Sequence, residues 1–244
     1  MRDMEAERSE AAGQAVARTR PWVLASGAAI GWALFTMILL HLVSSHDPVR
    51  DTISSYAVTN NGGGMLEASV LSLAIGSFTL LGALQAAGVP VTRTARTLLS
   101  AWAVGLVTAA LFPASFGERV DPASGRIHQY ACLIAFLSLP GVGFSLADRM
   151  RESPALRRMR TVLLRLTWIG VGMLALFGIS YVIAAFPSVP VLAEVSSWLP
   201  VGFAQRLALA ADLALLTGMT WAAVSTAKLP RSGGLTEPAE LGTS

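Results

Sequence analysis

The segment from Trp22 to Leu42 reads WVLASGAAIGWALFTMILLHL and contains no Asp, Glu, Lys or Arg. As an α-helix with a rise of about 1.5 Å per residue, it would cross the roughly 30 Å of hydrocarbon in a lipid bilayer. Its apolar residues run continuously, without the alternation that a strand of a membrane barrel requires. The segment therefore predicts a transmembrane helix.

Five further apolar blocks of similar character follow. We predict spans at Trp22–Leu42, Gly64–Ala87, Leu98–Phe112, Ile127–Ala147, Val162–Phe186 and Val201–Val224, the third being short enough to be tilted or extended. With 53% hydrophobic and 14% charged residues and a mean hydropathy of +0.58, the chain has too little polar surface for a soluble domain. We expect an all-α fold, a polytopic transmembrane bundle of about six helices.

The chain divides into three parts. Residues 1–20 mix basic and acidic side chains and are expected to form a mobile cytoplasmic tail, followed by a six-helix transmembrane domain over residues 21–227. Residues 228–244 are rich in Pro, Gly, Ser and Thr and predict a disordered cytoplasmic tail. No A-x-A cleavage pattern follows the first apolar block, so we expect it to remain as a signal anchor.

The distribution of basic residues predicts the orientation of the bundle. Placing both termini in the cytoplasm puts fourteen of the eighteen Lys and Arg residues inside, as the positive-inside rule favours. This pattern indicates a multi-pass protein of the cell (plasma) membrane. The net charge of +3 then lies beside the cytoplasmic leaflet, which favours membrane lipids rather than nucleic acid as partners.

Polar residues collect on the predicted outer side. The first outer loop reads SSHDPVRDTISSY from Ser44 to Tyr56, and Asp121 and His128 lie around the second outer loop. Arg206 falls about two turns into the last span, where a charge is costly unless it is paired or reaches water. We therefore expect a carboxylate partner for Arg206, with Asp51, Asp121 and Glu194 as candidates.

These residues resemble the bacterial and archaeal six-helix family catalogued as domain of unknown function 998. The resemblance rests on His46 with Asp51-x-x-Ser54-Ser55-Tyr56, on Phe112-Pro113 with Asp121 and His128, and on Gln205-Arg206, and covers about residues 20 to 227. It implies the six-helix architecture and brings no activity with it.

The clustered side chains suggest a reaction centre. We predict His46, Asp51, Ser54, Asp121 and His128 as catalytic residues; Ser54 or Ser55 would be a nucleophile, His128 its base and Asp121 the residue that orients the base. Alternatively, these serines form turns and caps, and the histidines fix loop one against the fourth helix. His46, Asp51 and His128 could also hold zinc, but their spacing matches no local metal motif, so no metal site is predicted.

Three further residues are predicted to bind substrate: Tyr56, Arg206 and Asp212. Asp212 is the only acidic residue deep in a span, which suggests a proton relay or a substrate contact. The alternative is an Asp held by hydrogen bonds to Ser, Thr or Tyr within the bundle. Cys132 lies alone within a span and is interpreted as a small apolar filler.

Two functional hypotheses follow. The first is a membrane-embedded protein whose outer-facing polar site binds or processes a lipid headgroup or a similar amphiphile. The second is a non-catalytic binding or sensor protein in which the same cluster is structural. A transporter is a weaker third interpretation because no internal repeat is found, and the absence of a phosphate-binding G-x-x-x-x-G-K-[ST] loop excludes an ATP-driven machine. The residues indicate no particular cofactor or oligomeric state.

Overall fold

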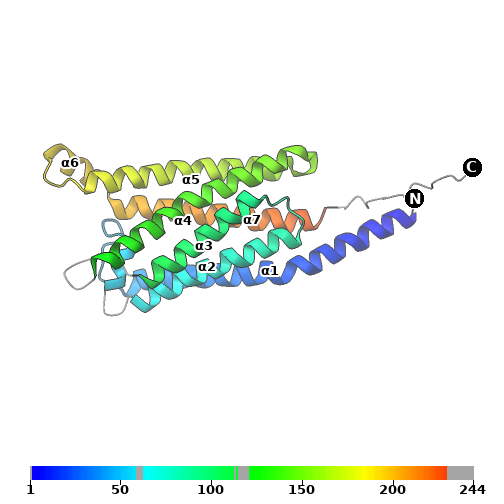
Figure 1. Ribbon diagram of the computed structural model, residues 1–244, viewed down its shortest axis with the longest axis horizontal. Helices are drawn as coiled ribbons and strands as arrows, with labels where there is room; N and C mark the ends of the chain where they lie inside the picture. The colour runs from blue at the N-terminus through cyan, green and yellow to red at the C-terminus, as the bar shows by residue number, and fades with distance from the viewer. Residues whose placement is uncertain (1, 59–62, 113, 115–120, 230–244) are drawn as a thin grey trace, which may run out of the picture.

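The computed structural model describes residues 2–58, 63–112, 114 and 121–229. These residues form helices and loops, and Figure 1 shows the long helices lying side by side. The long helices are α1 (Arg2–Val43), α2 (Gly63–Ala86), α3 (Arg93–Leu111), α4 (Pro122–Arg149), α5 (Arg157–Ala184) and α7 (Val201–Ala227). The shorter helices are η1 (Ile53–Val58), η2 (Met150–Glu152), η3 (Pro154–Leu156) and α6 (Pro190–Trp198).

The prediction of an all-α bundle with six spans is confirmed. Six helices of the described chain are long and apolar enough to cross a membrane. The third of them is longer than predicted, because it begins at Arg93 rather than at Leu98. The Thr92 side chain accepts a hydrogen bond from the Ala95 N–H at 2.8 Å, which satisfies an otherwise unpaired amide at the helix start.

The segment expected as an N-terminal tail is helical. Helix α1 begins at Arg2 and continues without interruption through residues 2–20 into the first span. The Ala, Glu, Arg and Gln residues of this segment have high helix propensity. The first span is already helical, so the segment only has to extend that helix and does not have to nucleate one. The mobility of residues 1–20 stays a prediction, and all but the first two residues of the predicted C-terminal tail lie outside the described residues.

The six long helices close into a ring of neighbours. Contacts run from α1 to α2, α3, α4 and α5 in chain order, and α5 then packs against α7. Helix α7 also contacts α1, α2, α4 and the short helix η1, which places it at the centre of the bundle. Within the core, the fully buried Trp102 donates its indole N–H to Ser77 Oγ at 2.9 Å.

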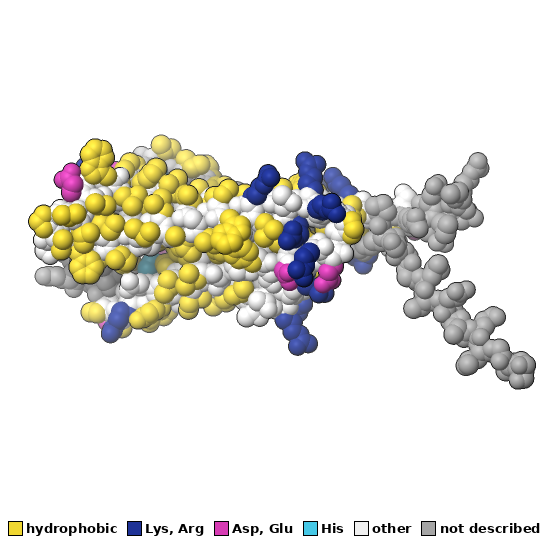
Figure 2. Space-filling view, turned by 90° about the horizontal axis from the view of Figure 1, so that it is seen from above, with side chains coloured by type: hydrophobic (Ala, Val, Ile, Leu, Met, Phe, Trp, Pro, Cys, Tyr) yellow, Lys and Arg dark blue, Asp and Glu magenta, His cyan; other side chains and the backbone are white. Residues whose placement is uncertain are grey.

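The outer surface of the bundle is apolar, as a lipid-facing surface must be. Large hydrophobic side chains such as Leu24, Trp32, Leu137 and Trp168 are more than half exposed. Figure 2 shows hydrophobic side chains along most of the visible face and Lys and Arg mainly toward one end. Helix α1 begins and α7 ends at one end of the bundle in Figure 1, but the side of the membrane that this end occupies stays a prediction.

None of the four short helices was predicted. Helix η1 lies in the first outer loop, and α6 lies between α5 and α7. Pro190 occupies the first turn of α6, where a proline costs no hydrogen bond. Ser180 Oγ donates to the Leu199 carbonyl at 2.9 Å, which ties the end of this connection to α5.

Candidate functional site

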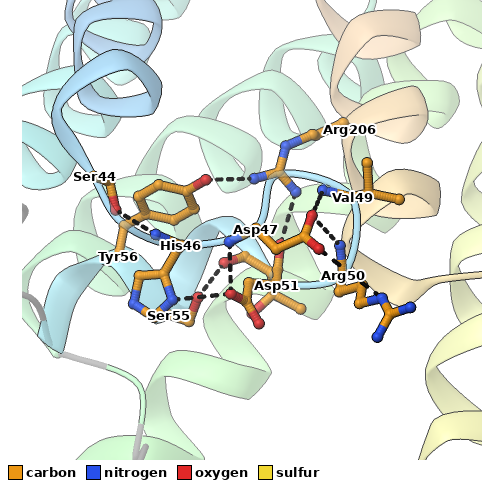
Figure 3. Close-up of polar contacts among 10 residues, drawn as sticks. Ser44, His46, Asp47, Val49, Arg50, Asp51, Ser55, Tyr56 and Arg206 are labelled. Carbon is orange, nitrogen blue, oxygen red and sulfur yellow. Dashed lines mark hydrogen bonds and ion pairs between the residues drawn. The ribbon is translucent and has the colours of Figure 1, made fainter.

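The segment from Ser44 to Tyr56, which the sequence predicts to be the first outer loop, is folded by its own side chains (Figure 3). The Asp47 carboxylate accepts hydrogen bonds from the backbone N–H groups of Val49 at 2.8 Å and Arg50 at 3.3 Å. Asp51 Oδ2 accepts from the Asp47 N–H and from His46 Nδ1, both at 3.0 Å. His46 and Asp51 therefore meet as predicted, but these contacts hold the loop in shape.

Arg206 fastens this loop to helix α7. Its guanidinium donates to His41 Nε2 at 3.0 Å, to the Asp51 carbonyl at 2.7 Å, to the Gly202 carbonyl at 2.9 Å and to Tyr56 Oη at 3.1 Å. Four of the five guanidinium N–H groups are thus used within the protein. The Arg206 Cζ also lies 5.7 Å from the centre of the Tyr56 ring, within the range of a cation–π contact.

The prediction of a carboxylate partner for Arg206 is wrong for the described residues. None of the ion pairs in this part of the chain includes Arg206, and Asp51 contributes its backbone carbonyl instead of its side chain. Glu194 accepts a hydrogen bond from Trp198 Nε1 at 3.3 Å, and Asp121 caps helix α4. A guanidinium can be satisfied by neutral oxygen and nitrogen acceptors, and the sequence alone gave no means of choosing them.

His128 has a defined tautomer. Its Nδ1 lies 2.9 Å from the carbonyl oxygens of both Ala109 and Phe112, and because carbonyls only accept, Nδ1 must carry the proton. In the neutral ring Nε2 is then an acceptor, 3.1 Å from Ser54 Oγ and 3.4 Å from Cys132 Sγ. The Ser54 hydroxyl therefore donates to His128, as a nucleophile would to its base.

The predicted three-residue arrangement is only partly present. Ser54 is the serine beside His128, whereas Ser55 Oγ donates to the Thr52 carbonyl within its own loop at 2.6 Å. Backbone carbonyls orient the imidazole where Asp121 was expected to do so. Asp121 instead accepts the backbone N–H two residues further on, at the start of α4.

A groove of about 510 Å³ adjoins the Ser54–His128 pair. Thr52, Ser54, Arg126, His128, Gln129 and Gln205 supply its polar lining, and Leu133, Phe136, Leu174 and Phe177 are among its apolar residues. These residues come from η1 and the loop before it and from α4, α5 and α7. Leu133 and Tyr181 on its walls are about half exposed, so the groove reaches the lipid-facing surface between α4 and α5.

The neighbouring residues Gln205 and Arg206 line two different spaces, so the polar residues belong to two sites. Gln205 Oε1 accepts the Ile53 N–H at 2.7 Å and lines the groove, whereas Arg206 lines a separate cavity of about 170 Å³ with His41 and Asp212. The single outer-facing cluster that the sequence suggested is thus two neighbouring sites joined by one loop. Sequence reasoning missed His41 and Gln205 as site residues, although both are polar residues near the ends of apolar helices.

The described residues contain no group of three His, Cys, Asp or Glu side chains that could hold a metal ion. His46 and Asp51 contact each other, and His128 contacts Ser54. Asp212 lies apart from these residues, 5% exposed, on the smaller cavity.

The six long apolar helices define the chain as a multi-pass helical membrane protein, and the groove opens between two of these helices, α4 and α5. The chain belongs to the family described as protein of unknown function DUF998, whose sequence model matches residues 27–222. The resemblance found in the sequence is confirmed. Comparisons with curated proteins and with solved structures gave no match.

Proposed function

We propose that the protein binds a membrane amphiphile in the groove between α4 and α5, with the polar headgroup beside Ser54 and His128. The observation that carries this proposal is the change in polarity along one continuous groove. Its polar residues on α4, Arg126, His128 and Gln129, lie in the first two turns of that helix. Phe136 lies eight residues beyond His128, which is about 12 Å along the helix axis.

The polar end suits an anionic or ester-containing headgroup. Arg126 supplies a cation on an exposed part of α4, and guanidinium groups bind phosphate oxygens through paired hydrogen bonds. The Gln205 side chain adds an amide whose oxygen is held by the Ile53 N–H. The apolar walls at Leu133, Phe136 and Phe177 would receive an acyl chain that enters from the bilayer.

The Ser54–His128 geometry supports acyl transfer as the reaction. Ser54 Oγ would attack the carbonyl carbon of an ester while its proton moves to His128 Nε2, and the same proton would then pass to the leaving alcohol. Water, activated by His128 in the reverse role, would release the acyl group from Ser54. Because the two carbonyls keep the proton on Nδ1, the Nε2 lone pair can accept the proton of Ser54.

A second function, non-catalytic binding or sensing, is favoured by the Arg206 contacts. Four of its N–H groups are already bound within the protein, which leaves one for a ligand. Under this proposal His46, Asp51, Tyr56 and Arg206 form a structural clasp for the first outer loop. The amphiphile then binds in the groove, and these four residues hold the loop.

A substitution that fills the groove tests ligand binding. An added Cβ at Gly178, which lines the groove, would have no other atom within 4 Å, and the same holds for Gly172, which does not line the groove. We expect Gly178→Leu to lower the amount of lipid that co-purifies in nanodiscs by about tenfold. A loss of about 1.4 kcal/mol of binding free energy produces a change of this size. The measurement is native mass spectrometry of the variant and of the Gly172→Leu control. Equal lipid occupancy in both variants and wild type would contradict the groove as the binding site.

A second pair of variants tests the reaction. Ser54→Ala is expected to lower ester-lipid cleavage in proteoliposomes on the order of a thousandfold or more, since it removes the nucleophile. Ser55→Ala is the control, because Ser55 bonds only to its own loop among the described contacts. An amphiphilic fluorophosphonate should label Ser54 in the wild type and lose its target in Ser54→Ala. Unchanged cleavage in Ser54→Ala would contradict acyl transfer at Ser54, while the proposal of ligand binding in the groove would stand.

A further inference from the structure

The cavity of about 170 Å³ is a second internal space, bordered by α1, α2, α3, α7 and η1. It shares no lining residue with the groove. Arg206 and His41 lie on it toward the outer end of the bundle. Asp212 lies six residues further along α7 than Arg206, about 9 Å along the helix axis.

Asp212 carries an unsatisfied acceptor on this cavity. The side chain is 5% exposed, and its Oδ2 has no hydrogen-bond partner among the described residues. An acceptor buried in an apolar setting without a donor costs free energy, and an ionised carboxylate costs far more. A ligand that brings a hydrogen-bond donor, and preferably a positive charge, would remove this cost.

Ser69 and Trp102, which line the same cavity, have their side-chain donors engaged elsewhere. The Ser69 hydroxyl donates to the Ala33 carbonyl at 2.7 Å, and the Trp102 indole N–H is bound to Ser77. At the far end, the Arg206 Nε–H is bound to His41. The ligand itself must therefore supply the donor at the Asp212 end.

Size and access narrow the class of ligand. A protein cavity of about 150 Å³ lined by apolar side chains can hold a benzene-sized molecule, and Leu34, Leu73, Leu209 and Leu213 give this cavity largely apolar walls. Leu34 is 41% exposed and Ala210 is also exposed, so the cavity borders the lipid-facing surface beside α1 and α7. A molecule dissolved in the bilayer could enter there.

We propose that this cavity binds a compact lipophilic amine, with its ammonium group against the Asp212 carboxylate and its hydrocarbon body among the leucines. The Trp102 ring on the cavity wall adds an aromatic surface of the kind that attracts cations. The Arg206 charge repels the ammonium group, so the amine points toward Asp212 and away from the outer loop. This site stands independently of the amphiphile groove.

The test uses cyclohexylamine as the probe and cyclohexanol as its neutral counterpart of nearly equal size. Binding to the full-length protein in detergent micelles is measured by saturation-transfer NMR and by the thermal unfolding midpoint. We expect cyclohexylamine to bind and to raise the midpoint, and Asp212→Asn to weaken its binding at least tenfold. Equal binding of cyclohexanol, or unchanged amine binding in Asp212→Asn, would overturn the proposal and leave an unselective apolar cavity.

A second variant keeps the test decisive if Asp212→Asn fails to fold. Ala210 is an exposed residue at the cavity edge, so Ala210→Phe should obstruct the amine site without disturbing the core. Ala214, exposed on the same helix but absent from the cavity lining, provides the control Ala214→Phe. Amine binding must fall in Ala210→Phe and persist in Ala214→Phe and in Gly178→Leu, and any other pattern contradicts this site. Persistence in Gly178→Leu also separates this proposal from the fate of the groove.

Discussion

Arg206→Ala is expected to lower the stability of the protein by about 3 kcal/mol or more. The substitution removes the donor from His41 Nε2, from the Asp51 carbonyl and from Tyr56 Oη. Each buried acceptor that loses its donor costs about 1–3 kcal/mol, and the bonds from Arg206 to His41 and to the Asp51 carbonyl are both partly buried. The first outer loop should separate from α7, which thermal unfolding in detergent and limited proteolysis of residues 44–58 would both detect.

Arg50→Ala provides the matched control, since Arg50 lies in the same loop with its side chain 80% exposed and only a 3.9 Å ion pair to Asp47. Such an exposed pair contributes about 0–1 kcal/mol, so this variant should remain close to wild type. Arg206→Lys should recover only part of the lost stability, because a compact ammonium cannot reach the acceptors that a planar guanidinium joins. Full recovery by lysine would mean that charge, rather than the shape of the clasp, holds the loop.

Gly202→Ala is expected to have an effect of similar size by a different cause. A Cβ at Gly202 would overlap the carbonyl group of Asp51 and lie 2.8 Å from the Val49 carbonyl oxygen. These are backbone atoms, so the loop itself would have to move, and the Phe203 N–H to Val49 carbonyl bond of 2.7 Å would be disturbed. We expect a marked fall in the unfolding midpoint together with faster proteolysis of the loop.

Gly31→Ala is the control for this prediction, because a Cβ at Gly31 meets no other atom within 4 Å. In a helix interior alanine is favoured over glycine by up to about 1 kcal/mol, so Gly31→Ala should be neutral or slightly stabilising. If Gly202→Ala were equally well tolerated, the close approach of α7 to the loop would not limit stability.

The spans could be predicted from the sequence because lipid imposes one dominant rule, a long apolar helix for each crossing. The start of α3 was missed because it depends on a local hydrogen bond at Thr92 that hydropathy does not register. Helix α6 was missed for a related reason, since nine residues between two spans form a pattern too short to stand out. The family resemblance supplied the architecture and no chemistry.

The site was harder to predict than the fold, because contacts between distant segments decide it. The sequence indicated that His128 and Ser54 could meet, and they lie 74 residues apart in the chain. It could not indicate that carbonyls of the preceding helix end would orient the imidazole, because every residue has a carbonyl. Likewise, Arg206 was expected to need an opposite charge, whereas the fold surrounds it with neutral acceptors.

Helix α1 is longer than a bilayer is thick. Its 42 residues extend for about 63 Å, roughly twice the hydrocarbon thickness of a bilayer, so much of the helix must stand outside the lipid. Pro21 lies within α1 and removes one helical hydrogen bond, which makes this the point where bending costs least. A fluorophore attached near residue 10 would thus be carried on a rigid spacer and report the tilt of this arm rather than the motions of the bundle.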